Sequence, residues 1–204
     1  MKSDISNGIF RKIAGLLVVC FSLFTFHFSL SAPVSAQRDY FTPEEVELIR
    51  DAQEIDKRID VLTHIVDRRF AALKIDVGGA KASAKDNEKW GEIPAGTRFQ
   101  LLLDIKRILQ KAIDDIDGLA ERPESAVLPE PDAKKTNGYA QLFPKAVRNL
   151  AAAAQRYRPV LKAELDKPND NAEKGSVLDA LDYCDQIIAA VAKLPAEAPK
   201  KKSK

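Results

Sequence analysis

Apolar residues recur at steps of three and four along four separate segments, and this spacing constrains the fold more than any other sequence feature. It gathers apolar side chains on one face of a helix, whereas a half-buried strand requires strict alternation. The four stripes consist of Leu48, Ala52, Ile55, Ile59, Leu62, Val66 and Leu73; Leu102, Ile105, Leu109, Ala112, Ile116 and Leu119; Phe143, Val147, Leu150, Ala154, Tyr157, Leu161 and Leu165; and Val177, Leu181, Cys184, Ile188 and Val191. The sequence after residue 36 is therefore predicted to be all-helical.

Capping motifs place the start of the first two helices. Thr42 with Glu45, and Thr97 with Gln100, form capping boxes, in which each side chain bonds the backbone N–H of the other residue. From Thr42 the apolar stripe continues toward Gly78-Gly79, so we expect a single first helix of about 30 residues. The second helix, which is apolar over a wide face, is expected to be central.

The last two helices have less regular boundaries. The third is expected at Tyr139–Leu165, and Pro159 inside it removes a backbone N–H and predicts a kink. The fourth is expected to start at a Ser176 cap, after a turn at 166–175, and to end before Pro195.

Two residues are expected at the margins of the core. Trp90 is the only large apolar residue in the polar connection 80–93, so it is expected to fold back onto the bundle. Arg69 occupies a seam position, where its stem can pack while its guanidinium reaches water. Four such stripes bury one another most economically in an antiparallel, up-down-up-down bundle of about four helices, with a proline-rich crossover at 122–138.

Residues 1–36 have the organisation of a signal peptide. A basic start is followed by an uncharged apolar run over Ile13–Leu30, and Val34-Ser35-Ala36 supplies the small-residue cleavage pattern. We expect cleavage after Ala36 and export to the periplasm or the extracellular space. The alternative is a membrane anchor through an uncleaved segment, because an apolar run of about 18 residues just reaches spanning length. Cys20 lies inside the run rather than at its end, which argues against lipidation.

Charge balance and cysteine content limit which partners and which kind of stabilisation can be expected. The chain has 32 Lys and Arg against 30 Asp and Glu, and the expected cleavage leaves 29 residues of each sign. A neutral mature chain gives no electrostatic reason to predict nucleic acid as a partner. Only Cys184 remains after cleavage, so the single domain predicted at 37–194 must be stabilised by its core rather than by a disulfide.

Residue types that perform catalysis or bind metals are sparse. His64, the one histidine after residue 36, is expected on the solvated face of the first helix, with Asp60 and Asp67 one turn away as potential metal partners. Cys184 is expected to be a buried, unreactive thiol. Two carboxylate clusters are expected on solvated helix faces: Asp114, Asp115 and Asp117, and Asp179, Asp182 and Asp185. The sequence predicts no catalytic set, no metal site and no cofactor.

The segment 195–204 is the most distinctive candidate for a function. Its prolines and alanines stop the fourth helix, and repulsion among its lysines predicts a disordered tail. The candidate interaction residues are Lys200, Lys201, Lys202 and Lys204. They suit an anionic envelope surface or an acidic patch on an envelope protein.

The function predicted from the sequence is a non-enzymatic interaction or scaffold module of the cell envelope. The wide apolar stripe of the first helix is a candidate face for a partner or for a homo-oligomer. The alternative is a small-ligand or metal carrier that uses the bundle interior, with Trp90, Tyr157 and Tyr183 as candidate pocket lining.

Overall fold

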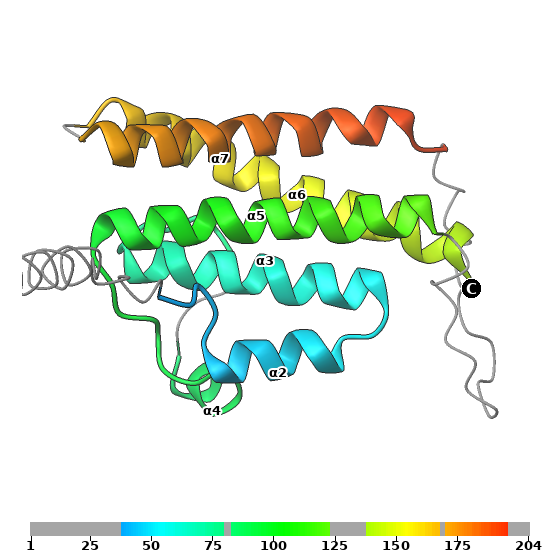
Figure 1. Ribbon diagram of the computed structural model, residues 1–204, viewed down its shortest axis with the longest axis horizontal. Helices are drawn as coiled ribbons and strands as arrows, with labels where there is room; N and C mark the ends of the chain where they lie inside the picture. Colours follow the sequence, from blue (N-terminus) through cyan, green and yellow to red (C-terminus); the bar gives the residue numbers. More distant parts are fainter. Residues whose placement is uncertain (1–37, 80–82, 123–137, 168–169, 196–204) are drawn as a thin grey trace, which may run out of the picture. The chain divides into compact units, whose positions relative to one another are not determined.

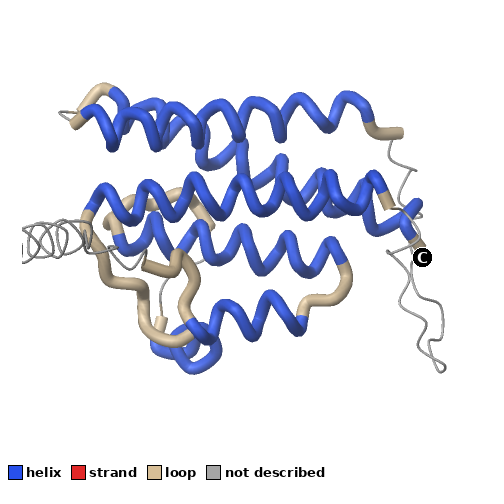
Figure 2. The backbone as a smooth tube through the Cα atoms, viewed as in Figure 1, coloured by secondary structure: helices blue, strands red, loops and turns tan. Residues whose placement is uncertain are grey.

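The computed structural model describes residues 38–79, 83–122, 138–167 and 170–195. The predicted signal peptide, most of the crossover and the lysine tail lie outside these ranges. The chain divides into two compact units, Met1–Asp39 and Tyr40–Lys204, and the helices of the described ranges all lie in the second. All regular structure in the described ranges is helical (Figure 2), which confirms the predicted fold class. None of the helices in these ranges combines the length and apolar character that crossing a membrane requires.

The second unit contains six α-helices and one short 3-10 helix within its described ranges, rather than the four helices expected. They are α2 (Pro43–Asp51), α3 (Ile55–Ala72), α4 (Ala84–Trp90), α5 (Arg98–Glu121), α6 (Tyr139–Leu165), α7 (Asn171–Ala190) and η2 (Val191–Lys193). The start of α5 at the Thr97 capping box and both ends of α6 agree with the sequence analysis.

The four long helices pack around one core, and two helices that follow each other in the chain are not neighbours in the bundle. Helices α3 and α7 each pack against both α5 and α6, whereas α5 and α6 contact each other only slightly across the core. Figure 1 shows α3 and α6 running in one direction and α5 and α7 in the other. Helices α5 and α6 are thus consecutive in the sequence but diagonal in the bundle, and α5 has parallel as well as antiparallel neighbours.

The core consists of the predicted apolar stripes and several of their flanking residues. Ile59, Leu62, Ile105, Leu161 and Cys184 have no exposed surface, and they come from α3, α5, α6 and α7. On α3, the flanking Ile65 and Phe70 are fully buried as well. These two positions are therefore occupied within this unit and do not supply the free partner face that the wide stripe suggested.

The expected single first helix is wrong, because the chain turns between α2 and α3. Helix α2 ends at Asp51, and α3 begins at Ile55 after an extended Glu54. The Arg58 Nε–H donates to the Ala52 carbonyl oxygen (3.0 Å), which occupies an acceptor freed by the turn. The apolar spacing continues through this turn, since Ala52 and Ile55 are both buried, so periodicity alone did not reveal it.

A buried ion pair explains why α2 folds back beside α3. The Glu45 carboxylate accepts two hydrogen bonds from the Arg69 guanidinium, at 2.7 and 2.6 Å, and neither side chain is more than 1% exposed. The same carboxylate completes the capping box by accepting from the Thr42 N–H (3.0 Å). The prediction that the Arg69 guanidinium reaches water is wrong, because α2 covers it and supplies the opposite charge of Glu45.

Helix α7 begins earlier than expected. Its N-cap is Asp170, whose carboxylate accepts from the Glu173 N–H (2.7 Å), and the helix then continues through Gly175. Ser176, the expected cap, is buried inside the helix, where its hydroxyl donates to the Ala172 carbonyl oxygen (3.1 Å). A capping sequence alone did not distinguish these two start positions.

A second buried cluster ties α3 to α6 and to the loop after α3. The Asp67 carboxylate accepts from the Tyr157 hydroxyl (2.7 Å) and from the Arg156 guanidinium (3.2 Å), which also donates to the Val77 carbonyl oxygen (3.1 Å). Gly79 lies so close to this pair that a Cβ there would overlap the Asp67 carboxylate. A glycine is therefore required for the loop to close over the cluster.

Replacing Glu45 by Gln is expected to lower the free energy of unfolding by about 3–5 kcal/mol, because Arg69 then keeps its buried charge without its main counter-ion. Urea denaturation measures the change. The control is Glu47→Gln on the exposed side of α2, where the lost pair with Arg50 is worth less than about 0.5 kcal/mol. Equal effects of the two substitutions would contradict a stabilising role for the buried pair.

Gly79 is tightly surrounded and Gly175 is not, so replacing each of them by alanine should have opposite effects on stability. Gly79→Ala is expected to destabilise the protein by about 1–3 kcal/mol, because the loop must move away from Asp67 and Arg156. Gly175→Ala is expected to stabilise it by up to about 1 kcal/mol, since it lies inside α7 with open space around it. Thermal unfolding of both variants measures these changes. A stabilised Gly79→Ala variant would refute the need for glycine at position 79.

Candidate functional site

An open cleft of about 340 Å³ lies along the outer face of α5. Five of its lining residues come from α5, one from the segment before α2 and one from α7. They are Lys106, Arg107, Gln110, Lys111 and Asp114, with Tyr40 and Tyr183. This cleft combines cationic, amide and aromatic side chains, which is the composition of a polar binding surface.

The helical repeat of α5 produces this surface directly. Residues 106, 107, 110, 111 and 114 are separated by steps of one, three and four, so they share one face of the helix. Ile105, just before this row, and Ile108, Leu109 and Ala112, between its members, are buried against the core. The packing of α5 against both α3 and α7 therefore fixes the direction of the polar row.

The cations of the cleft differ in how they are neutralised. Lys106 pairs with Asp179 of α7, and Lys111 pairs with Asp115 on its own helix (2.9 Å). The Arg107 guanidinium lies over the Tyr40 ring, 5.9 Å from its centroid, and no carboxylate from the described ranges pairs with it. Gln110 donates to the Asp114 carboxylate (2.8 Å). The cleft thus holds three cations against one lining carboxylate.

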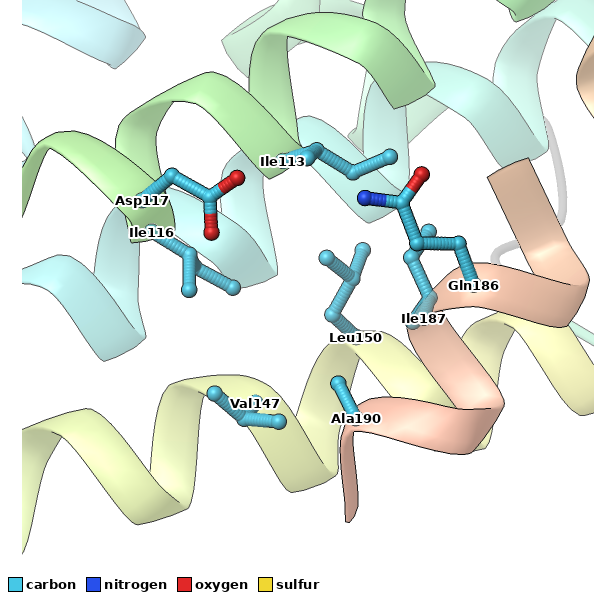
Figure 3. A pocket seen from close by; sticks show the side chains of 8 residues that line it. All are labelled: Ile113, Ile116, Asp117, Val147, Leu150, Gln186, Ile187 and Ala190. Carbon is cyan, nitrogen blue, oxygen red and sulfur yellow. The ribbon is translucent and has the colours of Figure 1, made fainter. Parts of the chain in front are cut away.

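A second, smaller cavity of about 50 Å³ lies between α5, α6 and α7 (Figure 3). Its lining is mainly apolar, with two polar side chains. It comprises Ile113, Ile116, Asp117, Val147, Leu150, Gln186, Ile187 and Ala190. Figure 3 shows these side chains converging from the three helices on one space. The size of the cavity matches a small apolar group rather than a large ligand.

The structure does not bring together the three aromatic residues predicted to line an internal pocket. Trp90 stacks on His64, with ring centroids 3.9 Å apart, and Tyr157 packs on Phe70 in the core. Tyr183 alone of the three lines the α5 cleft. Trp90 does fold back onto the bundle as predicted, and it is 6% exposed.

His64 is placed differently from the solvated position expected. Trp90 covers its ring, and its Nε2 lies 3.0 Å from the Asp86 carboxylate of α4. The two neighbours considered as metal partners are engaged elsewhere, Asp60 with Asn149 and Asp67 with Tyr157. Across the described ranges, no three His, Cys, Asp or Glu residues are grouped so that they could hold a metal ion.

Cys184 is buried, as the sequence predicted, and burial raises the pKa of its thiol to about 12. The carboxylate clusters are dispersed into separate contacts. Asp115 pairs with Lys111, Asp179 with Lys106, and Asp185 with Arg158. The four candidate lysines of the tail lie outside the described residues, so the structure does not place them.

Sequence analysis missed the α5 cleft because it classified the polar face of that helix by its aspartates alone. The row Lys106, Arg107 and Lys111 was the available signal, since these spacings place three cations on one helical face. The contribution of Tyr40 and Tyr183 had no local signal, because they come from segments brought near α5 only by the tertiary fold.

The environment of His64 predicts a pH-dependent stability. Burial lowers the pKa of His64 below its ordinary 6.5, against the opposing attraction of Asp86 and Asp67. The folded protein therefore releases the proton more readily than the unfolded chain. The contribution of His64 to stability is complete above pH about 6.5 and is lost as the pH falls toward the folded-state pKa.

We expect the difference in unfolding free energy between the wild type and His64→Gln to shrink as the pH is lowered from about 8 to 5. Urea titrations at each pH measure it, and NMR titration of the imidazole reports the folded-state pKa directly. A difference that is constant across this range, or a folded-state pKa above 6.5, would show that the stacked ring is not held neutral.

Comparison with known proteins gives no relative from which a function can be transferred. No protein-family model, no curated protein and no solved structure matches this chain.

Proposed function

We propose that this chain is an exported, non-enzymatic interaction or scaffold module of the cell envelope, and that the α5 cleft contacts an anionic envelope component. The predicted signal peptide is the basis for proposing export to the envelope. The observation that carries the proposal is the cleft itself, in which three cations and two tyrosines share an open surface. Such a surface suits adhesion to a polyanion more than conversion of a substrate.

The ion pairs of the cleft are compatible with an exchange of partners. Lys106 and its partner Asp179 both keep about a third to a half of their side-chain surface exposed. Exposed pairs of this kind contribute less than about 1 kcal/mol, because water already screens them. An incoming anion can therefore replace Asp179 beside Lys106 at little cost in free energy. Arg107 has no carboxylate partner in the described ranges that an anion would have to displace.

The predicted tail supplies a second cationic element. Lys200, Lys201, Lys202 and Lys204 would each add on the order of 1 kcal/mol near an anionic surface. Two weak attachments on one chain raise the overall affinity, provided that both reach the same polymer or surface. The tail and the cleft are proposed to act together in this way.

The chemistry of the remaining polar groups supports a non-enzymatic role. The thiol of Cys184 is poorly suited to act as a nucleophile, because a pKa of about 12 leaves it protonated at neutral pH. Glu45, Asp67 and Arg69 are engaged in contacts that hold helices together. These buried groups serve the fold and are not gathered at either cavity.

A carrier of small apolar molecules is the second candidate, and the cavity of Figure 3 favours it. Ile113, Leu150 and Ile187 provide apolar walls from three helices, and Gln186 offers an amide beside them. A volume of about 50 Å³ restricts the cargo to a small group or to one end of a longer chain. Mass spectrometry of the natively purified protein would reveal such a cargo.

Removing the cations of the cleft is expected to weaken binding to envelope material. We compare the mature wild type with Lys106→Gln/Arg107→Gln/Lys111→Gln and with a tail variant carrying glutamine at positions 200, 201, 202 and 204. Each lost contact should cost about 1 kcal/mol, or roughly fivefold in affinity, and salt should weaken the wild type most. Co-sedimentation with isolated envelope fractions measures the affinity.

The matched control removes three exposed charges that line neither cavity, in Lys162→Gln/Lys174→Gln/Lys193→Gln. This variant should bind like the wild type. A wild-type protein that binds no envelope fraction would refute the proposed function, and equal losses in the cleft and control variants would refute the role of the cleft.

A further inference from the structure

We infer that the ligand of the α5 cleft is an acidic polysaccharide, whose sugar rings pack on Tyr40 and Tyr183 and whose carboxylates pair with Arg107 and the neighbouring lysines. This inference rests on the proposed function and identifies the class of its anionic component. Each kind of side chain in the cleft has a separate role in this binding.

The two tyrosines distinguish a glycan from a simple inorganic anion. Tyr40 and Tyr183 are half-buried and line the same cleft from different elements. The electron-rich face of an aromatic ring attracts the slightly positive C–H groups on the apolar face of a pyranose. An inorganic anion has no C–H groups to pack on an aromatic ring, whereas a sugar chain can pack on both tyrosines.

Arg107 indicates that the ligand carries carboxylates. Its guanidinium is planar, weakly hydrated and able to donate two parallel hydrogen bonds to one carboxylate. The guanidinium carbon lies 5.9 Å from the centroid of the Tyr40 ring, within reach of a cation-π attraction, and no carboxylate from the described ranges pairs with Arg107. A uronate residue offers both a carboxylate for Arg107 and a ring for the adjacent aromatic face.

The remaining lining residues fit a hydroxyl-rich ligand. The Gln110 amide presents both a donor and an acceptor, which match sugar hydroxyls. Asp114 holds that amide by accepting from it (2.8 Å), and as the single lining carboxylate it can also accept from hydroxyls. Lys106 and Lys111 extend the cationic surface along α5, so successive acidic sugars can be engaged.

An anionic membrane surface fits the cleft less well. Membrane-binding faces combine cations with apolar side chains that enter the headgroup region. Among the described residues, the large hydrophobic side chains with high exposure are Val46 and Leu178, and neither lines this cleft. The surface therefore has the charge for a lipid headgroup but lacks the apolar wedge.

The test is calorimetric titration of the mature protein with a galacturonate oligosaccharide, with its carboxyl-reduced neutral form, and with vesicles containing anionic phospholipid. We expect binding to the acidic oligosaccharide, and at least about tenfold weaker binding to the neutral form. Arg107→Gln should weaken the acidic oligosaccharide about tenfold and Tyr183→Leu severalfold, while the Lys162→Gln control should leave it unchanged.

Three outcomes would overturn the inference. They are failure of the wild type to bind the acidic oligosaccharide, equal affinity for the neutral form, and binding to vesicles alone. Unfolding curves that match the wild type confirm that the variants are folded. If the protein still binds envelope fractions while the oligosaccharide fails, the ligand class is wrong and the proposed function stands; if both fail, both are refuted.

Discussion

The buried pair of Glu45 and Arg69 is the interaction on which the arrangement of this unit depends. Arg69 follows Arg68 on α3, and two adjacent arginines cannot be buried without partners. Glu45 from α2 neutralises Arg69. Arg68 donates to the Asp86 carboxylate of α4 (3.3 Å) and to the Gly91 and Glu92 carbonyl oxygens just after α4 (2.9 and 2.7 Å). Two neighbouring charges on one helix thereby fix both of the short helices that cover it.

The same principle operates on the opposite side of α3. Asp67 lies one position before Arg68, so it faces a different neighbour and accepts from Tyr157 and Arg156 of α6. Three consecutive residues of α3 thus contact α6, α4 and α2 through polar groups rather than apolar ones. Because a buried polar group is costly without its own partner, these contacts restrict the packing more narrowly than exchangeable apolar residues do.

The sequence predicted the elements of this fold better than their arrangement. Periodicity and capping boxes gave the helical class, the start of α5 and both ends of α6, because these signals are local. The turn at Ala52 and Ile55 was missed because the apolar spacing survives it. The burial of Arg69 was missed because its partner lies 24 residues earlier and is brought near only by that turn. The α5 cleft was missed for the same reason, since Tyr40 and Tyr183 have no local relation to Arg107.

The distribution of charge between the interior and the surface links the fold to the proposed function. Inside, Arg68 and Arg69 of α3 are each held by several acceptors at fixed positions, so these two cations are unavailable to an external ligand. On the outer face of α5, Lys106 pairs with the half-exposed Asp179, Lys111 pairs with Asp115 on its own helix, and Arg107 lies over the Tyr40 ring. The interior therefore uses its charges for stability, whereas the proposed function uses the exposed charges of the cleft, whose pairs add little to stability. A rigid helical support with an exchangeable cationic face has the properties that reversible attachment to a polyanion requires.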